Sequence, residues 1–291
     1  MTQPLFVAEV GSNHLQDLSR CFKLIDTAKA IGCGAVKFQL FTLETLFAPV
    51  VNRPGQTDQA GISYADRKKR ELPLEFIPHL AQYCHEAGLQ FACTPFYLEA
   101  VEELQPYVDF YKISSFDLLR LDLLRACAET GGPVVLSTGA AILVEVDIAV
   151  TTLRQAGCRD LTVLQCVSMY PLPPEQCNLS TIALMRERYG CPAGLSDHST
   201  NLGAILRAVF HWGASMVECH LDLEGEGSEM PYGHCWLPDK LALAIQAVRD
   251  GLAADGDGTK EPMPIELGER EWRADPSDGM RPLLSKRREL E

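Results

Sequence analysis

The sequence has no long hydrophobic run and no leader-like start. None of its apolar stretches approaches the roughly 20 residues that a membrane-spanning helix needs. The first residues, MTQPLFVAEVGSNH, carry no basic group ahead of their apolar run, and Glu9 interrupts that run. No signal peptide is expected, and the chain is predicted to work in the cytoplasm without a membrane anchor.

Basic residues are also in short supply. The 291 residues contain 26 lysines and arginines against 39 acidic residues, which gives a net charge of −13. This balance argues against nucleic acid or an anionic membrane as the main partner. It leaves room for a small anionic substrate, because a few lysines gathered in a cleft can dominate the local potential.

Cysteine is plentiful, but the spacing typical of metal-binding cysteines is lacking. The eleven cysteines lie mostly in apolar segments such as FACTPF and VLQCVS, and none forms C-x-x-C. An odd number without metal spacing indicates reduced, buried thiols in a cytosolic protein.

What the chain does contain is a regular alternation of short apolar runs and helix-length segments. Runs typical of buried strands span residues 5–11, 35–40, 89–96, 109–115, 133–139, 161–168, 193–199 and 215–221. Helices are expected at 18–32, 74–88, 119–131, 142–157, 178–190, 200–213 and 238–253. This α/β alternation predicts a (β/α)8 TIM barrel. A doubly wound sheet would carry G-x-G-x-x-G after its first strand, where GSNHLQD stands instead.

Two segments lie outside a minimal barrel. Residues 41–73 form a long loop after the second expected strand, and loops of this length are usually functional or mobile. Residues 255–291 are polar and rich in Pro, Asp and Arg. We expect residues 1–254 to form the catalytic barrel and residues 255–291 to form a C-terminal arm or tail, with no separate domain.

Each expected strand ends in polar groups that are costly to bury. Burying one unpaired polar group costs about 1–3 kcal/mol. For any single ending, a satisfied core group or a helix cap is the ordinary explanation. Because the carboxyl ends of all barrel strands open onto one face, the endings taken together predict a functional site there.

Positive charge and hydroxyl groups recur among these endings. Lys37 and Lys112 would supply the charge, and Ser115, Ser137 and Ser196 would supply hydroxyls. Such a set suits a phosphate or a carboxylate.

Histidines end the last two expected strands. His198 and His220 lie at neighbouring strand ends, near Glu9 and Glu218. Neutral imidazoles placed in this way could bind one divalent metal.

Eight ordered segments of the chain resemble one known family. AEVGSNH, AVKFQ, TPF, YKISSFDL, VVLSTG, S-x-YPLP, GLSDHS and VECHLDL resemble, in that order, the catalytic barrel of the sialic acid synthases, which make N-acetylneuraminate, legionaminate and pseudaminate. The resemblance runs from about residue 5 to residue 253. It implies a metal-dependent condensation of phosphoenolpyruvate with an aldose, giving a 2-keto-3-deoxy sugar acid and phosphate. The implied metal is Mn²⁺, with Mg²⁺ or Co²⁺ as alternatives.

The resemblance also implies roles for individual residues. The implied catalytic residues are Glu9, Glu218 and His234; those for phosphoenolpyruvate are Lys37, Lys112, Ser115, Ser137 and Ser196; those for the sugar are Gln39, Thr94, Ser168, Tyr170 and Glu229; the metal ligands are His198 and His220.

The chain departs from the family pattern at its C-terminal end. The family usually continues into an antifreeze-like domain that sends an arginine into the partner's site in a swapped dimer, and we expect no such domain within these 291 residues. Arg273 or Arg281 would be the substitutes, and a homodimer is left open.

Two loops also depart from the family pattern. Where the family reads G-P-D-H, this chain has EGEGSEMPYGHCWLP, so His234 matches the histidine, Gly233 replaces the aspartate, and Glu229 could supply a carboxylate. Tyr232 and Trp236 suit a sugar face and a packed loop end equally well. Where the family reads G-x-N-H-N-G, this chain has GSNHLQD, which keeps Asn-His and loses the following Asn-Gly. An unusual acceptor sugar is expected.

Two other functions remain open. An aldolase acting on pyruvate would use Lys112 as a Schiff-base lysine. A non-catalytic protein that binds a sugar phosphate would have no need of Glu9 beside a metal.

Overall fold

The structure is a computed structural model and describes residues 2–57 and 61–291. It divides into two compact units, the first ending at Leu252 and the second comprising Ala253–Glu291. Within the described residues, no helix has the length and apolar character that a membrane span requires.

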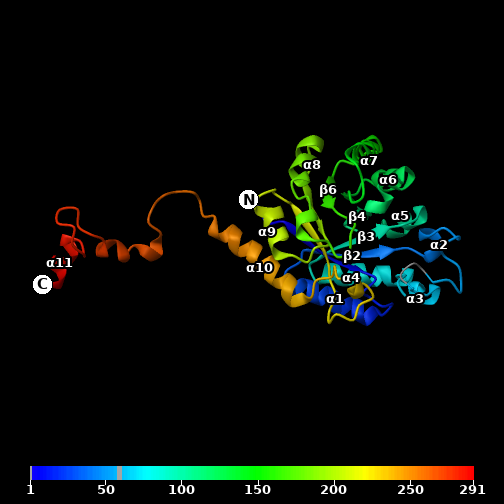
Figure 1. Ribbon diagram of the computed structural model, residues 1–291, viewed down its shortest axis with the longest axis horizontal. Coiled ribbons are helices and arrows are strands. Elements are labelled where there is room, and N and C mark those ends of the chain that lie inside the picture. Colours follow the sequence, from blue (N-terminus) through cyan, green and yellow to red (C-terminus); the bar gives the residue numbers. More distant parts are fainter. Residues whose placement is uncertain (1, 58–60) are drawn as a thin grey trace. The chain divides into compact units, whose positions relative to one another are not determined.

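The first unit is built on a closed barrel of eight parallel strands, as the sequence predicted (Figure 1). The strands are β1 (Leu5–Gly11), β2 (Ala35–Leu40), β3 (Gln90–Pro95), β4 (Phe110–Ile113), β5 (Val134–Ser137), β6 (Leu161–Cys166), β7 (Ala193–Asp197) and β8 (Met216–His220). Each strand pairs with the next, and β8 pairs back with β1. All eight lie within the ranges expected from the apolar runs, which confirms the (β/α)8 prediction.

Helices surround the strands and cover their outer face (Figure 1). They are α1 (Leu18–Ile31), α4 (Ile77–Glu86), α5 (Leu98–Leu104), α6 (Leu121–Glu129), α7 (Leu143–Gln155), α8 (Thr181–Tyr189), α9 (Leu202–Phe210) and α10 (Pro238–Ala254). The expected set omitted α5. This helix has only seven residues and follows Tyr97, whose side chain forms no capping hydrogen bond, so the usual start signal is missing.

The inward side chains explain why a site forms at one end of the barrel. Side chains two residues apart point to the same face of a strand. An apolar layer lies inside the barrel, formed by Val7, Ala35, Ala92, Phe110, Val135, Leu164 and Met216. Two positions later on the same strands stand Glu9, Lys37, Thr94, Lys112, Ser137, Cys166 and Glu218. The strand period therefore places these groups just above the apolar layer.

A glycine occupies the inward position of β7 at the level of the apolar layer. A Cβ at Gly194 would lie 2.3 Å from the carbonyl oxygen of Met216 and 2.9 Å from Cδ2 of Leu164. The close packing of β7 on β8 therefore leaves no room for a side chain, and the first inward polar groups of this strand are Ser196 and His198.

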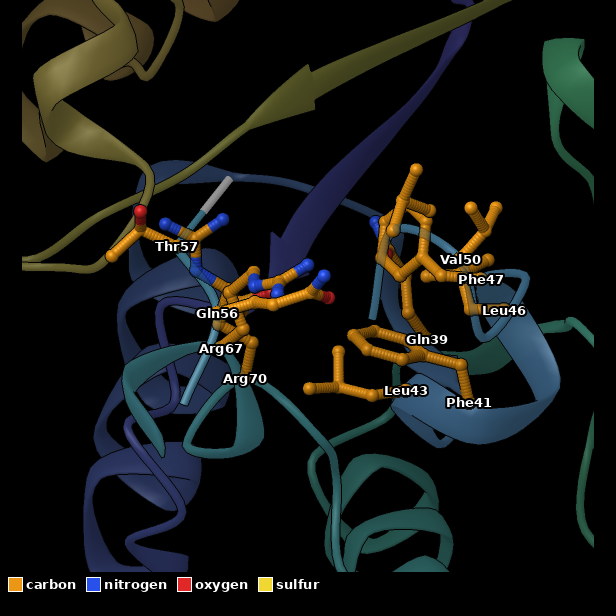
Figure 2. A pocket seen from close by; sticks show the side chains of 12 residues that line it. Gln39, Phe41, Leu43, Leu46, Phe47, Val50, Gln56, Thr57, Arg67 and Arg70 are labelled. Carbon is orange, nitrogen blue, oxygen red and sulfur yellow. The ribbon is translucent and has the colours of Figure 1, made fainter. Parts of the chain in front are cut away.

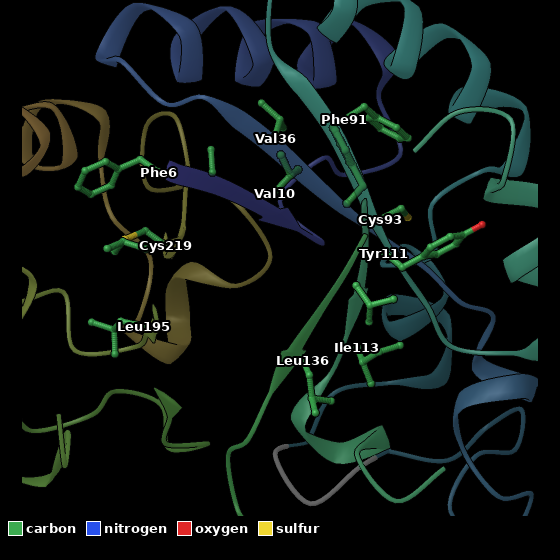
Figure 3. Close-up of a cluster of buried hydrophobic side chains, with 14 of the residues drawn as sticks. Phe6, Val10, Val36, Phe91, Cys93, Tyr111, Ile113, Leu136, Leu195 and Cys219 are labelled. Atoms are coloured by element: carbon green, nitrogen blue, oxygen red, sulfur yellow. The ribbon is translucent and has the colours of Figure 1, made fainter. Parts of the chain in front are cut away.

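The outward side chains form the main hydrophobic core between the barrel and the helices (Figure 3). Phe91 and Cys93 on β3 and Tyr111 and Ile113 on β4 belong to it, and all four are buried. Because both faces of each strand are packed, the strands are nearly continuously apolar until their polar ends.

The long loop after β2 contains two short helices, α2 (Leu43–Leu46) and α3 (Tyr64–Lys68). In the second unit lie two 3₁₀ turns, Pro264–Glu266 and Glu269–Trp272, and helix α11 (Leu284–Leu290). The prediction that residues 255–291 form an arm rather than a domain stays a prediction.

Candidate functional site

Most of the predicted strand-end groups line one small cavity of about 80 Å³ at the carboxyl end of the barrel. The predicted residues among its lining are Glu9, Lys37, Gln39, Thr94, Lys112, Ser115, Ser137, Tyr170, Ser196, His198, Glu218 and His220. Ser168, Glu229 and His234 are not part of this lining. Twelve of the residues that were expected to act together therefore lie around one cavity.

Buried charges of both signs meet at the centre of this cavity. Nζ of Lys37 lies 2.6 Å from Oε2 of Glu9 and 3.8 Å from Oε1 of Glu218. Burial alone would lower the pKa of Lys37, but the Glu218 and Glu9 carboxylates outweigh it and raise that pKa above its ordinary value. Lys37 is therefore held as a cation.

Lys112 occupies a less favourable electrostatic position. Its Nζ lies 3.5 Å from Oε1 of Glu218. Burial lowers the pKa of Lys112, and the Glu218 carboxylate only partly offsets this, while the nearby Lys37 adds to the lowering. An added anion beside Lys112 would relieve the repulsion between the two ammonium groups.

Hydroxyl groups line the wall near Lys112. Oγ of Ser137 is buried and has no hydrogen-bond partner among the described residues. Oγ of Ser115 accepts a hydrogen bond from the backbone N–H of Gly139 at 2.9 Å. A Cβ at Gly139 would lie 2.3 Å from Oγ of Ser168, so a glycine at this position leaves room for the Ser168 hydroxyl. An unpaired buried hydroxyl beside a lysine is suited to an oxyanion.

Gln39 and Thr94 hold the lysine–glutamate pair in place. Nε2 of Gln39 donates a hydrogen bond to Oε1 of Glu9 at 2.5 Å, and Nζ of Lys37 donates one to Oγ1 of Thr94 at 3.3 Å. Lys37 and Gln39 therefore each hold one carboxylate oxygen of Glu9, which fixes its side chain at the mouth of the barrel.

His198 and His220 lie side by side, with ring centroids 5.4 Å apart. Nδ1 of His198 donates to the carbonyl oxygen of Val167 at 2.9 Å, and Nδ1 of His220 donates to Oε2 of Glu229 at 2.7 Å. In the ranges that the structure describes, Nε2 of neither ring forms a hydrogen bond. Each ring is thus held in the tautomer that leaves Nε2 able to bind a metal.

Glu229 and His234 lie beside His220, not in the wall of the central cavity. Nε2 of His234 is 3.6 Å from Oε2 of Glu229. Burial would raise the pKa of Glu229, but His220 and His234 outweigh it and hold that pKa below its usual range. Burial lowers the pKa of His234 despite the opposing effect of Glu229.

A second arrangement of metal-ligating atoms is present next to the histidine pair. One ligand atom from each of His220, Glu229, His234 and Cys235 lies within 4.8 Å of the others. His220 belongs both to this group and to the predicted pair with His198. The donor set, with imidazole nitrogens, a carboxylate and a thiol, fits a divalent transition metal at this end of the barrel.

The aromatic residues of the site divide into two kinds. The ring of Tyr170 lies between His198 and His234, with centroid distances of 4.5 and 4.7 Å. Trp236 is buried, and its Nε1 donates to Oδ2 of Asp197 at 2.9 Å. Trp236 therefore packs the end of its loop against the protein interior, whereas Tyr170 lines the cavity.

The acidic residue of the GLSDHS segment has a structural role. Oδ1 of Asp197 accepts hydrogen bonds from the backbone N–H of Ser199 at 3.1 Å and from its hydroxyl at 2.5 Å. Together with the bond from Trp236, these contacts fix the turn after β7 and hence His198. Asp197 and His198 are adjacent in the sequence, but only His198 lines the cavity.

The turn GSNHLQD keeps left-handed geometry without the family's Asn-Gly. Leu15 and Gln16 have φ values of 54° and 55°. Oδ1 of Asn13 accepts a hydrogen bond from the backbone N–H of Glu229 at 2.9 Å, a contact that the sequence did not predict. Asn13 therefore helps to position the carboxylate that holds His220.

Other lining residues were also missed from the sequence. Cys166 lies inside the cavity, and its thiol is 4.0 Å from Nδ1 of His198. Burial would raise the pKa of this thiol, but His198 outweighs it and lowers it. The position of Cys166, inward and two residues after Leu164, was the available signal. Arg273 and Arg281 belong to the second unit, so they are not placed relative to this site.

Comparisons with known proteins show the family to which the chain is similar. A family model described as the NeuB family matches residues 24–260. The chain is 34% identical over 278 residues to a pseudaminic acid synthase of Helicobacter pylori, covering 93% of this chain and 81% of that protein. It is 30% identical over 270 residues to an N,N′-diacetyllegionaminic acid synthase of Campylobacter jejuni, covering 90% and 80%.

A solved structure has the same architecture. The crystal structure of an N-acetylneuraminic acid synthetase from Leptospira borgpetersenii superposes with a TM-score of 0.77 at 28% identity, covering 95% of this chain and 93% of that one. The sequence relatives and this structure confirm the resemblance drawn from the eight ordered segments. The chain belongs to the NeuB family and is an enzyme of the synthase class.

Proposed function

We propose that the enzyme condenses phosphoenolpyruvate with an aldose, with the help of a divalent metal, to give a 2-keto-3-deoxy sugar acid and phosphate. The observation that carries the proposal is the arrangement of Glu9, Lys37, Lys112, His198 and His220 around one cavity. This arrangement places an anion site, a carboxylate and two imidazole Nε2 atoms around one cavity, where phosphoenolpyruvate and an aldose could bind next to each other.

Phosphoenolpyruvate would bind at the lysine side of the cavity. Lys37 and Lys112 would face its carboxylate and phosphate, and Ser137 would donate its unpaired hydroxyl. Ser115 and Ser196 would complete the contacts. The support for this placement is the repulsion between two buried ammonium groups, which a bound anion would reduce.

The aldose would bind at the histidine side, where His198 and His220 would hold the metal. When bound, the metal would polarise the aldehyde as a Lewis acid. Mn²⁺ is the proposed ion, with Mg²⁺ or Co²⁺ as alternatives, because imidazole ligands suit transition metals. Gln39, Thr94, Ser168 and Tyr170 would contact the sugar.

The reaction would form one carbon–carbon bond and break one carbon–oxygen bond. C3 of phosphoenolpyruvate would attack the aldehyde carbon, whose oxygen takes up a proton. Glu9 would stabilise the positive character left at C2, and water would add there and release a proton. The resulting hemiketal phosphate would lose phosphate by cleavage of its C2–O(phosphate) bond while the C2 hydroxyl gives up its proton, which leaves the 2-keto group. Glu9 is suited to this role because it is fully buried and held on both oxygens by Lys37 and Gln39.

We further propose that the enzyme works in the cytoplasm. The support is that all eleven cysteines are free thiols and ten of them are buried. A homodimer remains open as the assembly.

The test measures phosphate release from phosphoenolpyruvate with a panel of aldoses. Release should require the aldose and Mn²⁺, stop with EDTA and return when Mn²⁺ is restored. His220→Ala should abolish it, whereas His79→Ala, which removes an exposed histidine on α4, should not. Phosphate release that persists in EDTA, or in His220→Ala, would contradict the proposal.

One observation favours a second candidate, a pyruvate aldolase. The lowered pKa of Lys112 leaves more of its amine neutral, as a Schiff-base lysine requires. Borohydride in the presence of pyruvate would then attach pyruvate to Lys112, and Lys112→Met would prevent it. No attachment is expected if Lys112 only binds the anion.

A further inference from the structure

We propose that residues 41–57 and 61–76, the described part of the loop between β2 and α4, form a subsite for an oxyanion carried by the acceptor sugar, and that Arg67 binds this oxyanion. The inference rests on the proposed function, since it concerns the acceptor of that reaction. It names the chemical class of the acceptor, an aldose that carries a carboxylate or a phosphate.

The subsite is a cavity of about 530 Å³ beside the central one. Figure 2 shows its two sides: Arg67 and Arg70 lie with Gln56 and Thr57 on one side, and Leu46, Phe47 and Val50 lie on the other. A pocket with cationic groups facing an apolar wall is suited to a ligand that has both an anionic and an apolar part.

The surroundings of the Arg67 side chain indicate that the subsite binds an anionic ligand. The residue is only 5% exposed, and its Nε and Nη2 atoms are buried with no hydrogen-bond partner. Among the residues with described placement, no carboxylate forms an ion pair with it. Its guanidinium carbon lies 6.0 Å from the centroid of the Phe47 ring. A buried guanidinium normally has a paired anion, because leaving the charge unpaired is unfavourable.

The unpaired atoms define what would bind. Nε and Nη2 lie on the same edge of the planar guanidinium and donate two parallel hydrogen bonds. This edge matches the two oxygens of a carboxylate or two oxygens of a phosphate. An acetamido oxygen could accept hydrogen bonds from this edge, but it carries no negative charge and would leave the guanidinium charge unpaired.

The subsite and the central cavity share a lining residue. Gln39 lines both cavities, and its Nε2 donates to Glu9 at 2.5 Å. Ser12 also lines the subsite, and its backbone N–H donates to Oε1 of Glu229 at 2.7 Å. One aldose could therefore place its aldehyde near Glu9 and its substituent near Arg67.

The segment that carries Arg67 is held in position. Nε2 of Gln16 donates hydrogen bonds to the carbonyl oxygens of Lys68 and Glu71 at 3.0 and 2.9 Å. Nη2 of Arg70 donates to the hydroxyl of Tyr232 at 3.0 Å. These contacts tie helix α3 to the turn after β1 and to the loop after β8, so the guanidinium is presented at a fixed place.

The experiment compares ligands that differ only in their anionic group. Calorimetry would measure binding of three alditols, which lack the aldehyde and cannot react: N-acetylmannosaminitol, its 6-phosphate and N-succinylmannosaminitol. Phosphoenolpyruvate is kept at a saturating concentration so that the anion site at Lys37 and Lys112 is occupied. We expect at least one anionic alditol to bind about tenfold or more tightly than the neutral one, as a charge-assisted pair allows. The phosphate and succinyl compounds separate the two sources of the oxyanion.

Variants assign the preference to Arg67. Arg67→Gln should reduce the preference for the anionic alditol to about one, and Arg67→Lys should retain part of it. Lys69→Gln is the matched control: it removes the same charge two residues further along, from a side chain that is 70% exposed and pairs with Asp66. Lys69→Gln should keep the full preference.

Stability measurements exclude a purely structural role. Because Nε and Nη2 of Arg67 are buried without a hydrogen-bond partner among the described residues, Arg67→Met should leave the thermal midpoint of the free protein unchanged or higher. A midpoint lowered by several degrees would show that Arg67 is structural and would overturn the inference. So would equal affinity for all three alditols, no binding of either anionic one, or an anionic preference that survives Arg67→Gln.

The outcome is separable from that of the proposed function. If the anionic alditol binds through Arg67 but no phosphate is released with any aldose, the subsite stands and the condensation fails. If phosphate is released with neutral aldoses and Arg67→Gln has no effect on binding, the condensation stands and the subsite fails.

Discussion

Oε2 of Glu229 accepts a hydrogen bond from Nδ1 of His220 at 2.7 Å, although the two residues lie on different elements. His220 ends β8, and Glu229 follows in the loop after it. The same carboxylate also accepts a hydrogen bond from the backbone N–H of Ser12 at 2.7 Å. A carboxylate in this position fixes the tautomer of a metal-binding histidine and raises the basicity of its other nitrogen.

Glu229→Gln should therefore weaken Mn²⁺ binding without removing a metal ligand from the histidine pair. Loss of a carboxylate partner of this kind typically costs about 10–100-fold in metal affinity. Calorimetric titration of the metal-free protein with Mn²⁺ would measure the change. Glu226→Gln, an exposed substitution in the same loop, is the control and should leave the affinity unchanged. Equal Mn²⁺ affinity in Glu229→Gln and the unsubstituted protein would refute the positioning role.

The position of the Glu229 carboxylate leads to a second prediction, which concerns Gly11. A Cβ at Gly11 would lie 2.1 Å from Oε1 of Glu229, and its φ of +53° is left-handed. Gly11→Ala should lower the free energy of unfolding by about 1–2 kcal/mol through the backbone. It should also displace Glu229 and weaken Mn²⁺ binding.

A matched glycine separates these two effects. Gly88 has a φ of +76°, and a Cβ added there would meet no described residue within 4 Å other than its chain neighbours. Urea unfolding should show similar destabilisation for Gly88→Ala and Gly11→Ala, but only Gly11→Ala should weaken Mn²⁺ binding. If both variants bind Mn²⁺ alike, Glu229 moves aside at no cost and the prediction is wrong.

The barrel and the members of its central site could be predicted from the sequence because both follow from short periodicities. Each strand is apolar on both faces until its end, and the inward polar group comes two residues after an inward apolar one, as Lys37 follows Ala35. The closed parallel topology then brings distant strand ends together. Helix α5 was missed because seven residues without a capping side chain carry too little periodicity.

The loops could not be predicted in the same way. The position of Glu229 depends on Asn13, which is 216 residues away, and no local pattern encodes that contact. Likewise, the YADRKKR segment reads as a solvated charge run, and only the folded loop buries Arg67 while leaving its neighbour Lys69 exposed. The exact position of His198 also depends on the turn after β7, which the hydrogen bond from Trp236 to Asp197 stabilises.

Glu218 should make the stability of the protein depend on acidic pH. Burial would raise its pKa, but Lys112 and Lys37 outweigh it and lower the pKa from 4.5 to about 2. A carboxyl whose pKa is lower in the folded state contributes stability above pH 4.5, and this contribution is lost as the pH falls toward 2. Glu218→Gln leaves two buried ammonium groups with less compensation and should cost about 3–5 kcal/mol near neutral pH.

The pH dependence distinguishes Glu218 from an ordinary buried residue. Urea unfolding in EDTA at pH 7, 4 and 3 should show the stability difference between the native chain and Glu218→Gln shrinking as the pH falls. Glu102→Gln, at an exposed position on α5, should give a small difference that does not vary with pH. A difference for Glu218→Gln that stays constant down to pH 3 would mean that packing, not charge, accounts for it.

Ser137→Ala should separate ligand binding from stability. Oγ of Ser137 is buried without a partner among the described residues, so its removal breaks no hydrogen bond seen in the folded protein and should shift the thermal midpoint little. If Ser137 donates to phosphoenolpyruvate, loss of a hydrogen bond to a charged group costs about 1.5–3 kcal/mol, which is about tenfold or more in affinity. Ser215→Ala is the control at the opposite end of the barrel, where Oγ donates to the carbonyl oxygen of Ala193 at 3.1 Å. Calorimetry with phosphoenolpyruvate should show weaker binding for Ser137→Ala alone, and unchanged binding would exclude Ser137 from the anion site.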